Sequence, residues 1–194
     1  MISTLTGIYD VLGSFSMLAG IDPSLPGAPP FRIEIVSTRR GSVALASGVP
    51  VEAKGGVDEI DNTDIIIVPS VLWAPDGWKP GRYPELVAWT ARMHGQGALL
   101  CSACSGVFLL AETGLFDGQE TTVHWGYAET FAKTFPAVPL HPERVLVVSG
   151  EREQLVTSGA SMDLARSGTV SHRLACRRRR GPGRRADLCA AMAS

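Results

Sequence analysis

The stretch ALLCSACSGVFLLAETGLFDG, residues 98–118, runs from an apolar strand-like segment through a group of small residues into an apolar helix-like segment. The residues around Cys104 are all small, and they are Ser102, Ala103, Ser105 and Gly106. A strand that bends directly into a helix packs closely at the bend, so the turn called a nucleophile elbow needs small neighbours. The stretch therefore predicts a strand-to-helix turn in a strained backbone conformation, with Cys104 at its apex.

Two interpretations of Cys104 follow from this position. Its sulfur would lie near backbone N–H groups at the start of a helix, which favour a thiolate and make Cys104 a candidate nucleophile. Alternatively, Cys104 is a buried cysteine that acts as a small hydrophobic residue; the small neighbours on both sides favour the elbow. The C-x-x-C spacing of Cys101 and Cys104 does not indicate a redox motif, because Cys101 falls inside the predicted strand rather than at the start of a helix.

A histidine is expected at the same edge of the sheet as this turn. The segment ETTVHW, residues 120–125, is predicted to be a strand that ends at His124. The carboxyl ends of parallel strands meet at one edge, where ligands gather. His124 is therefore a second candidate catalytic residue that hydrogen-bonds the Cys104 thiol or a ligand, although a structural partner for this histidine is equally compatible with the sequence.

Candidate ligand-binding residues lie beside these two. Trp125 follows His124 and would supply an apolar wall, and Ser105 adjoins the elbow cysteine. Ser70, at the end of the apolar segment 64–70, and the backbone after Pro69 could donate hydrogen bonds to an anion held above Cys104. These residues predict a small-molecule site at this edge.

Apolar segments of strand and helix type alternate along the chain. Strands are expected at 31–37, 64–70, 97–103 and 120–125, helices at 3–15, 84–94, 105–116 and 126–135, paired extended segments at 42–46 and 49–53, and a closing hairpin at 144–150 and 153–159. Continuous apolar strands between helices are typical of a parallel sheet buried on both faces. The sequence thus predicts an α/β fold, a three-layer sandwich around a mostly parallel central sheet of flavodoxin-like type.

Composition narrows the class of protein. The chain has 194 residues, enough for one domain with a sizeable core, and its apolar runs are too short to cross a bilayer. No export signal is evident at the start, so we expect a cytoplasmic protein with its four cysteines as thiols and no membrane partner. The four histidines show no metal-ligand spacing and no glycine-rich phosphate loop is present, so neither a metal nor a cofactor is expected.

Charge is distributed unevenly. Residues 1–162 hold 10 Lys and Arg against 17 Asp and Glu, a net charge of −7, whereas residues 163–194 hold eight Arg against two Asp, a net charge of +6. The basic segment has no helical periodicity, and we expect it to be poorly ordered and to stay outside the core. Codons chosen for this segment and shifted by one base encode apolar residues at helical spacing, so our hypothesis is that residues 163–194 are an out-of-frame tail.

The motifs together resemble a known family. CSACSGVFLLAETGLFDG, followed by TTVHW, then FP, then LVTSGASM, closely resembles the ThiJ/PfpI superfamily, which has a class I glutamine amidotransferase-like fold. The resemblance covers residues 3–162 and is strongest to the amino-terminal domain of AraC-type transcriptional regulators. It implies that Cys104 matches the elbow cysteine of the superfamily and His124 its partner histidine.

The resemblance implies a small-molecule-sensing domain that forms a homodimer and reaches DNA only through a separate downstream domain. The alternative is a cysteine-dependent hydrolase, hydratase or deglycase-type enzyme of the same superfamily. Such enzymes usually carry a carboxylate on the first helix, where this chain has Thr4, a candidate ligand-binding residue, and this departure weakens the enzyme interpretation. The superfamily's first strand would precede this helix, and Met1 already falls at it, so we expect the first strand and the last helix of the fold to be lacking.

Overall fold

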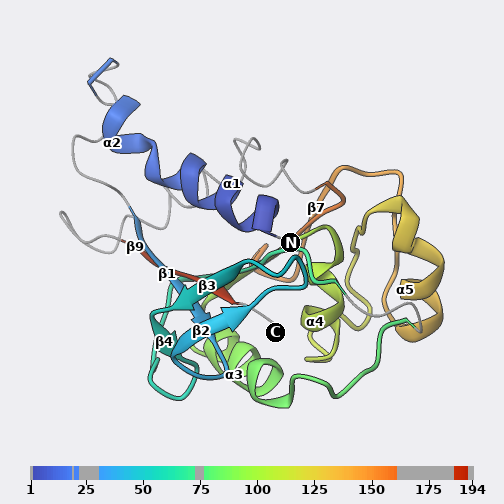
Figure 1. Ribbon diagram of the computed structural model, residues 1–194. Coiled ribbons are helices and arrows are strands. Elements are labelled where there is room, and N and C mark those ends of the chain that lie inside the picture. The colour runs from blue at the N-terminus through green and yellow to red at the C-terminus, as the bar shows by residue number, and fades with distance from the viewer. Residues whose placement is uncertain (1, 19, 22–30, 73–76, 161–185, 192–194) are drawn as a thin grey trace.

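The computed structural model describes residues 2–18, 20–21, 31–72, 77–160 and 186–191 (Figure 1). The helices are α1 (Ile2–Gly13), α2 (Phe15–Leu18), α3 (Pro84–Gly95), α4 (Val107–Ala111) and α5 (Ala128–Thr134), with 3-10 turns η1 (Cys104–Gly106) and η2 (Trp125–Tyr127). The strands are β1 (Phe31–Ser37), β2 (Gly41–Ala44), β3 (Pro50–Ala53), β4 (Gly55–Gly56), β5 (Ile65–Val68), β6 (Leu99–Ala103), β7 (Leu146–Ser149), β8 (Leu155–Ser158) and β9 (Ala186–Ala191).

A central sheet of seven strands organises the molecule. Its order is β4-β1-β9-β5-β6-β8-β7, and all neighbouring strands are parallel except β7, which runs antiparallel to β8. The antiparallel pair β2 and β3 forms a separate small sheet. This architecture confirms the predicted α/β fold with a mostly parallel sheet.

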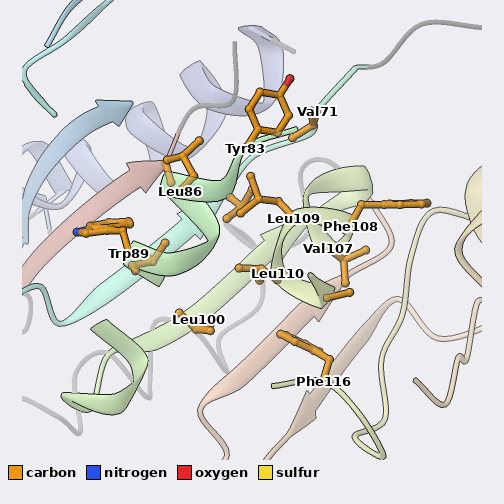
Figure 2. Close-up of a cluster of buried hydrophobic side chains, with 14 of the residues drawn as sticks. Val71, Tyr83, Leu86, Trp89, Leu100, Val107, Phe108, Leu109, Leu110 and Phe116 are labelled. Atoms are coloured by element: carbon orange, nitrogen blue, oxygen red, sulfur yellow. The ribbon is translucent and has the colours of Figure 1, made fainter. Parts of the chain in front are cut away.

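Helices cover both faces of the sheet, and side chains alternate between the two cores. Ile65 and Ile67 of β5 belong to one buried cluster, together with Ile8 and Leu12 of α1. Ile66 and Val68 belong to the other cluster, together with the α3 and α4 side chains Leu86, Trp89, Met93, Phe108 and Leu110. Figure 2 shows four of these helix side chains, Leu86, Trp89, Phe108 and Leu110. The period of two along a strand therefore places α1 on one face and α3 and α4 on the other, as Figure 1 shows.

Two predicted elements differ from the structure. Residues 120–125 do not form a strand, and Thr121 makes only a single bridge with Leu140. Thr122 uses its polar groups elsewhere: its N–H donates to Thr157 Oγ1 at 3.0 Å, and its Oγ1 donates to the Arg144 carbonyl at 2.7 Å. The helix predicted for 105–116 is also shorter, because α4 ends at Ala111 and turns follow.

The basic segment supplies a central strand. β9 lies between β1 and β5, parallel to both, and Leu188 and Ala190 are 1% and 0% exposed. Polar contacts fix its first residues: Arg32 Nε donates to Asp187 Oδ1 at 2.7 Å, the Asp187 N–H donates to Asp64 Oδ2 at 2.9 Å, and Thr63 Oγ1 donates to the Asp187 carbonyl at 2.9 Å. The expectation that residues 163–194 stay outside the core is therefore wrong for residues 186–191.

The remainder of that segment, 163–185 and 192–194, lies outside the described residues, so its predicted disorder and its out-of-frame origin stay predictions. Among the described residues, no helix is long and apolar enough to cross a membrane.

Candidate functional site

Cys104 lies where β6 turns into η1 and α4, as the sequence predicted. Its φ of 54° places a non-glycine residue in the left-handed region, whereas Ala103 before it is extended. A side chain in that region costs about 1–2 kcal/mol, so the surrounding contacts must hold the turn in place. The strained elbow expected at Cys104 is present.

Close packing against the end of β5 fixes this elbow. A Cβ on Gly106 would lie 2.2 Å from the Val68 carbonyl oxygen and 2.7 Å from that of Pro69, so only glycine fits there. Ser105 Oγ donates to the Val71 carbonyl at 2.6 Å and lies 2.9 Å from Ser70 Oγ. The two hydroxyls tie the loop after β5 to the elbow, and their predicted contact with a ligand stays a prediction.

His124 reaches the same edge of the sheet without being part of a strand. The Thr122 contact to Thr157 anchors this segment at the carboxyl end of β8, where Ser158 pairs with Ala103, the residue before Cys104. The backbone of His124 begins η2, and its Nδ1 accepts a hydrogen bond from the Gly126 N–H at 3.2 Å. A neutral imidazole whose Nδ1 accepts carries its proton on Nε2, so His124 presents an N–H donor at its outer nitrogen.

Aromatic rings surround His124. Trp125 is 77% exposed, and its ring centroid lies 5.2 Å from that of His124 at an interplanar angle of 32°. The ring centroid of Tyr127 lies 5.9 Å from that of His124 and 6.5 Å from that of Phe108 in α4. Trp125 is thus an exposed ring beside His124, and its predicted role as a wall of the ligand site stays a prediction.

Sequence reasoning missed Tyr127 and Gly126. Burial raises the pKa of the Tyr127 phenol, and the nearby Cys104 thiol, when ionised, raises this pKa further. The sequence pattern places Tyr127 only in the helix predicted for 126–135, and its spacing of three residues from His124 is the signal that links it to the site.

The surroundings of the Cys104 sulfur contain few polar partners. Cys104 is 6% exposed, and within the described residues its sulfur makes no hydrogen bond to a carboxylate or to an imidazole. Thr4, in the first turn of α1, is fully buried, and its Oγ1 has no hydrogen bond in the described part of the chain. No described contact joins Thr4 to Cys104, so its role as a ligand-binding residue stays a prediction.

A cavity of about 310 Å³ lies at the opposite edge of the sheet. It adjoins the amino ends of β1 and β9 and the loop before β5, and is lined by Arg32, Glu34, Glu59, Ile60, Asp61, Asn62, Asp187, Leu188 and Cys189. In the part of the chain that the structure describes, no group of three or more His, Cys, Asp or Glu side chains could hold a metal ion.

Several curated relatives of this chain are transcriptional regulators. This chain is 28% identical over 136 residues to the HTH-type transcriptional regulator CdhR of Pseudomonas aeruginosa. The match covers 69% of this chain and 38% of the relative. The chain is 26% identical over 164 residues to the HTH-type transcriptional regulator GbdR of the same species, with coverage of 81% and 43%. The chain therefore spans about two fifths of the length of these relatives.

Solved structures share the fold. An AraC family transcriptional regulator from Pseudomonas putida matches with a TM-score of 0.67 and 20% identity, over 94% of this chain and 88% of that one. A ThiJ/PfpI family protein from Pseudomonas syringae matches with a TM-score of 0.62 and 19% identity, over 95% and 72%. The model of the DJ-1/PfpI family matches residues 27–166, most of the chain and all of the elbow. With its elbow cysteine between β6 and α4, this chain belongs to the DJ-1/PfpI family.

Proposed function

We propose that this chain is the small-molecule-sensing domain of an AraC-type transcriptional regulator, with the ligand held above Cys104 and His124 and against Trp125. The similarity to HTH-type regulators supports this proposal, as does the share of their length that the chain spans. Contact with DNA is assigned to a separate domain of the regulator. A homodimeric, cytoplasmic protein is part of the same proposal, and light scattering of the purified chain tests the dimer.

The observation that carries the proposal is the hydrogen bond that His124 Nδ1 accepts from the Gly126 N–H. A cysteine hydrolase needs a base that accepts the thiol proton. The Nδ1 lone pair of His124 already accepts from the Gly126 N–H, and the other nitrogen of a neutral ring carries the proton. The histidine is therefore arranged to donate a hydrogen bond to a ligand rather than to deprotonate Cys104.

This arrangement also indicates the kind of ligand. An Nε2–H donor beside an exposed indole fits a small molecule that presents an oxygen acceptor, such as a carboxylate or a carbonyl, together with some apolar surface. The predicted donors at Ser70 and the backbone after Pro69 would serve the same acceptor.

Thermal unfolding of the 194-residue chain, measured with a panel of small carboxylates and their uncharged amides, tests the proposal. We expect at least one carboxylate to raise the melting temperature. This shift is lost in His124→Ala and Trp125→Ala. The matched control is His141→Ala, because His141 lies outside the site beside Glu120 and Glu143.

Two results would count against sensing. An equal shift in His124→Ala and the unchanged chain would place the ligand elsewhere. Cys104-dependent turnover of a glyoxal, an isonitrile or an amide would favour the enzyme alternative.

A further inference from the structure

The hydroxyls of Ser70 and Ser105 form a hydrogen-bonded chain whose direction is fixed. Ser105 Oγ donates to the Val71 carbonyl at 2.6 Å, and a carbonyl oxygen can only accept. A serine hydroxyl carries one proton, so the Ser70 hydroxyl is the donor in its 2.9 Å contact with Ser105 Oγ. The Ser70 proton is therefore used within the protein, and the backbone is the predicted donor of this loop that remains for a ligand.

One backbone donor of this loop is buried and unpaired. Val71 lies beyond the carboxyl end of β5 and is 6% exposed, and within the described residues its N–H has no acceptor. Buried backbone N–H groups in folded proteins are nearly always paired, with protein groups, ordered water or a ligand. Ser105, the residue after Cys104, holds Val71 through its carbonyl, so this unpaired N–H lies beside the elbow.

Two kinds of contact hold the loop against the elbow. The Val68 and Pro69 carbonyls approach Gly106 so closely that a Cβ has no room there. This contact fixes a separation, whereas the hydrogen bond from Ser105 to Val71 also fixes an orientation, because it depends on direction. Ser105 is fully buried, so water does not compete for its hydroxyl proton. The orientation of Val71 therefore depends on one side chain.

We propose that Ser105 is a positioning residue, whose hydroxyl holds Val71 so that the Val71 N–H donates a hydrogen bond to a ligand carboxylate above Cys104. The inference rests on the proposed function and deepens it, because it separates the groups that contact the ligand from the residue that orients the loop.

The topology supplies a reason for a carboxylate. Val71 follows β5, and His124 is anchored through Thr122 at the end of β8, so the two donors flank β6 and the elbow from opposite sides. One donor is the Val71 N–H and the other is the His124 Nε2–H. A carboxylate presents two acceptor oxygens and forms stronger hydrogen bonds than a neutral carbonyl, so it satisfies both donors.

Sodium acetate is the probe for this contact. It is titrated into the 194-residue chain carrying isotope-labelled valine, with sodium chloride at equal ionic strength as the reference, and amide signals are followed by NMR. Val71→Ile identifies the Val71 signal by its loss. We expect acetate to move this signal downfield in a saturable way. Ser105→Ala should weaken the apparent acetate affinity about three- to tenfold, the effect of one lost hydrogen bond.

The matched control is Thr63→Val. It also removes a buried hydroxyl that donates to backbone carbonyls, but at the amino ends of β5 and β9, away from the elbow. Both variants should be less stable in urea than the unchanged chain, whereas only Ser105→Ala should lose acetate affinity. An equal loss of affinity in the two variants would assign the effect to stability and overturn the positioning role.

Two further results would overturn the proposal. One is an acetate affinity of Ser105→Ala equal to that of the unchanged chain. The other is a Val71 signal that acetate does not move in the unchanged chain, a result that needs no Ser105 variant. The sensing function is tested separately through His124 and Trp125, so a ligand held by these two residues alone would leave sensing intact while the role of Ser105 fails.

Discussion

At the scale of single residues, the elbow requires a left-handed backbone conformation and a position without a side chain, and two different residues meet these requirements. The left-handed backbone conformation falls on Cys104, which pays a conformational penalty, while Gly106 has an ordinary helical φ of −59°. The glycine is needed for space, because the Val68 and Pro69 carbonyls approach it directly. The strain at Cys104 is thus maintained by the contact at Gly106, and the two residues act as one unit.

Replacement of Gly106 by alanine tests this unit. The added Cβ would overlap the Val68 carbonyl oxygen at 2.2 Å, so we expect a loss of about 1–3 kcal/mol in the free energy of unfolding. The matched control is Gly95→Ala in α3, where nothing lies within 4 Å of the new atom and the unfolding free energy should hold or rise. Urea denaturation measures both variants. Equal stability of the two would mean that the elbow can move away from β5.

At the scale of elements, the end of α4 anchors the segment that precedes α3. Glu112 accepts hydrogen bonds from the Trp78 indole N–H and from the Gly81 N–H, both at 2.8 Å. Trp78 is 8% exposed, and its ring centroid lies 5.4 Å from that of Phe108. One carboxylate therefore fixes an aromatic side chain against the same phenylalanine that contacts Tyr127.

We expect Glu112→Ala to lower the free energy of unfolding by about 1–3 kcal/mol, because it leaves the buried indole N–H without its acceptor. The control is Glu129→Ala, which removes an exposed ion pair with Lys133 and should change stability little. Thermal melts of the two variants compare them directly. If the melting temperature of Glu112→Ala is not lower than that of Glu129→Ala, water replaces the carboxylate as the acceptor.

Most elements could be predicted because their patterns are local. The apolar run of β5, the helical spacing of α3 and the small residues of the elbow each identify their element from a few neighbouring residues. The segment before His124 could not be assigned correctly, since Thr122 makes its hydrogen bonds to Thr157 and Arg144, residues distant in sequence. The ring contact between Tyr127 and Phe108 also depends on how two separate elements pack.

At the scale of the whole molecule, the strand β9 could not be predicted for a different reason. Its sequence ADLCAA is rich in alanine, a poor strand former, and follows an arginine-rich segment, so neither propensity nor pattern indicates a central strand. Its place depends on ladders with β1 and β5 and on the Asp187 contacts, which are properties of the assembled sheet. Tertiary context here overrides local preference.

The thiol of Cys189 reports whether β9 is buried. Burial raises the pKa of Cys189 to about 11, against an ordinary value of 9.0 for an exposed thiol. The protonated thiol is therefore favoured in the folded state, so its contribution to stability is complete below pH 9 and is lost as the pH rises toward 11. Relative to Cys189→Ala, the unchanged chain should lose on the order of 2 kcal/mol over this range.

Urea denaturation of both proteins between pH 7 and 11 measures this difference, and the other titrating groups are common to the two. Parallel stability profiles would mean that Cys189 is solvated and that β9 does not occupy the centre of the sheet.

The position of β9 also governs when the protein can fold during synthesis. Arg32 and Asp187 are separated by 155 positions in the sequence, yet they are neighbours across the β1–β9 pair. While a ribosome is still making the chain, β1 and β5 have emerged but both lack the strand that joins them, and each presents an unpaired edge. The sheet can be completed only after residues 186–191 have left the exit tunnel, so the central pairing forms late relative to the synthesis of β1 and β5.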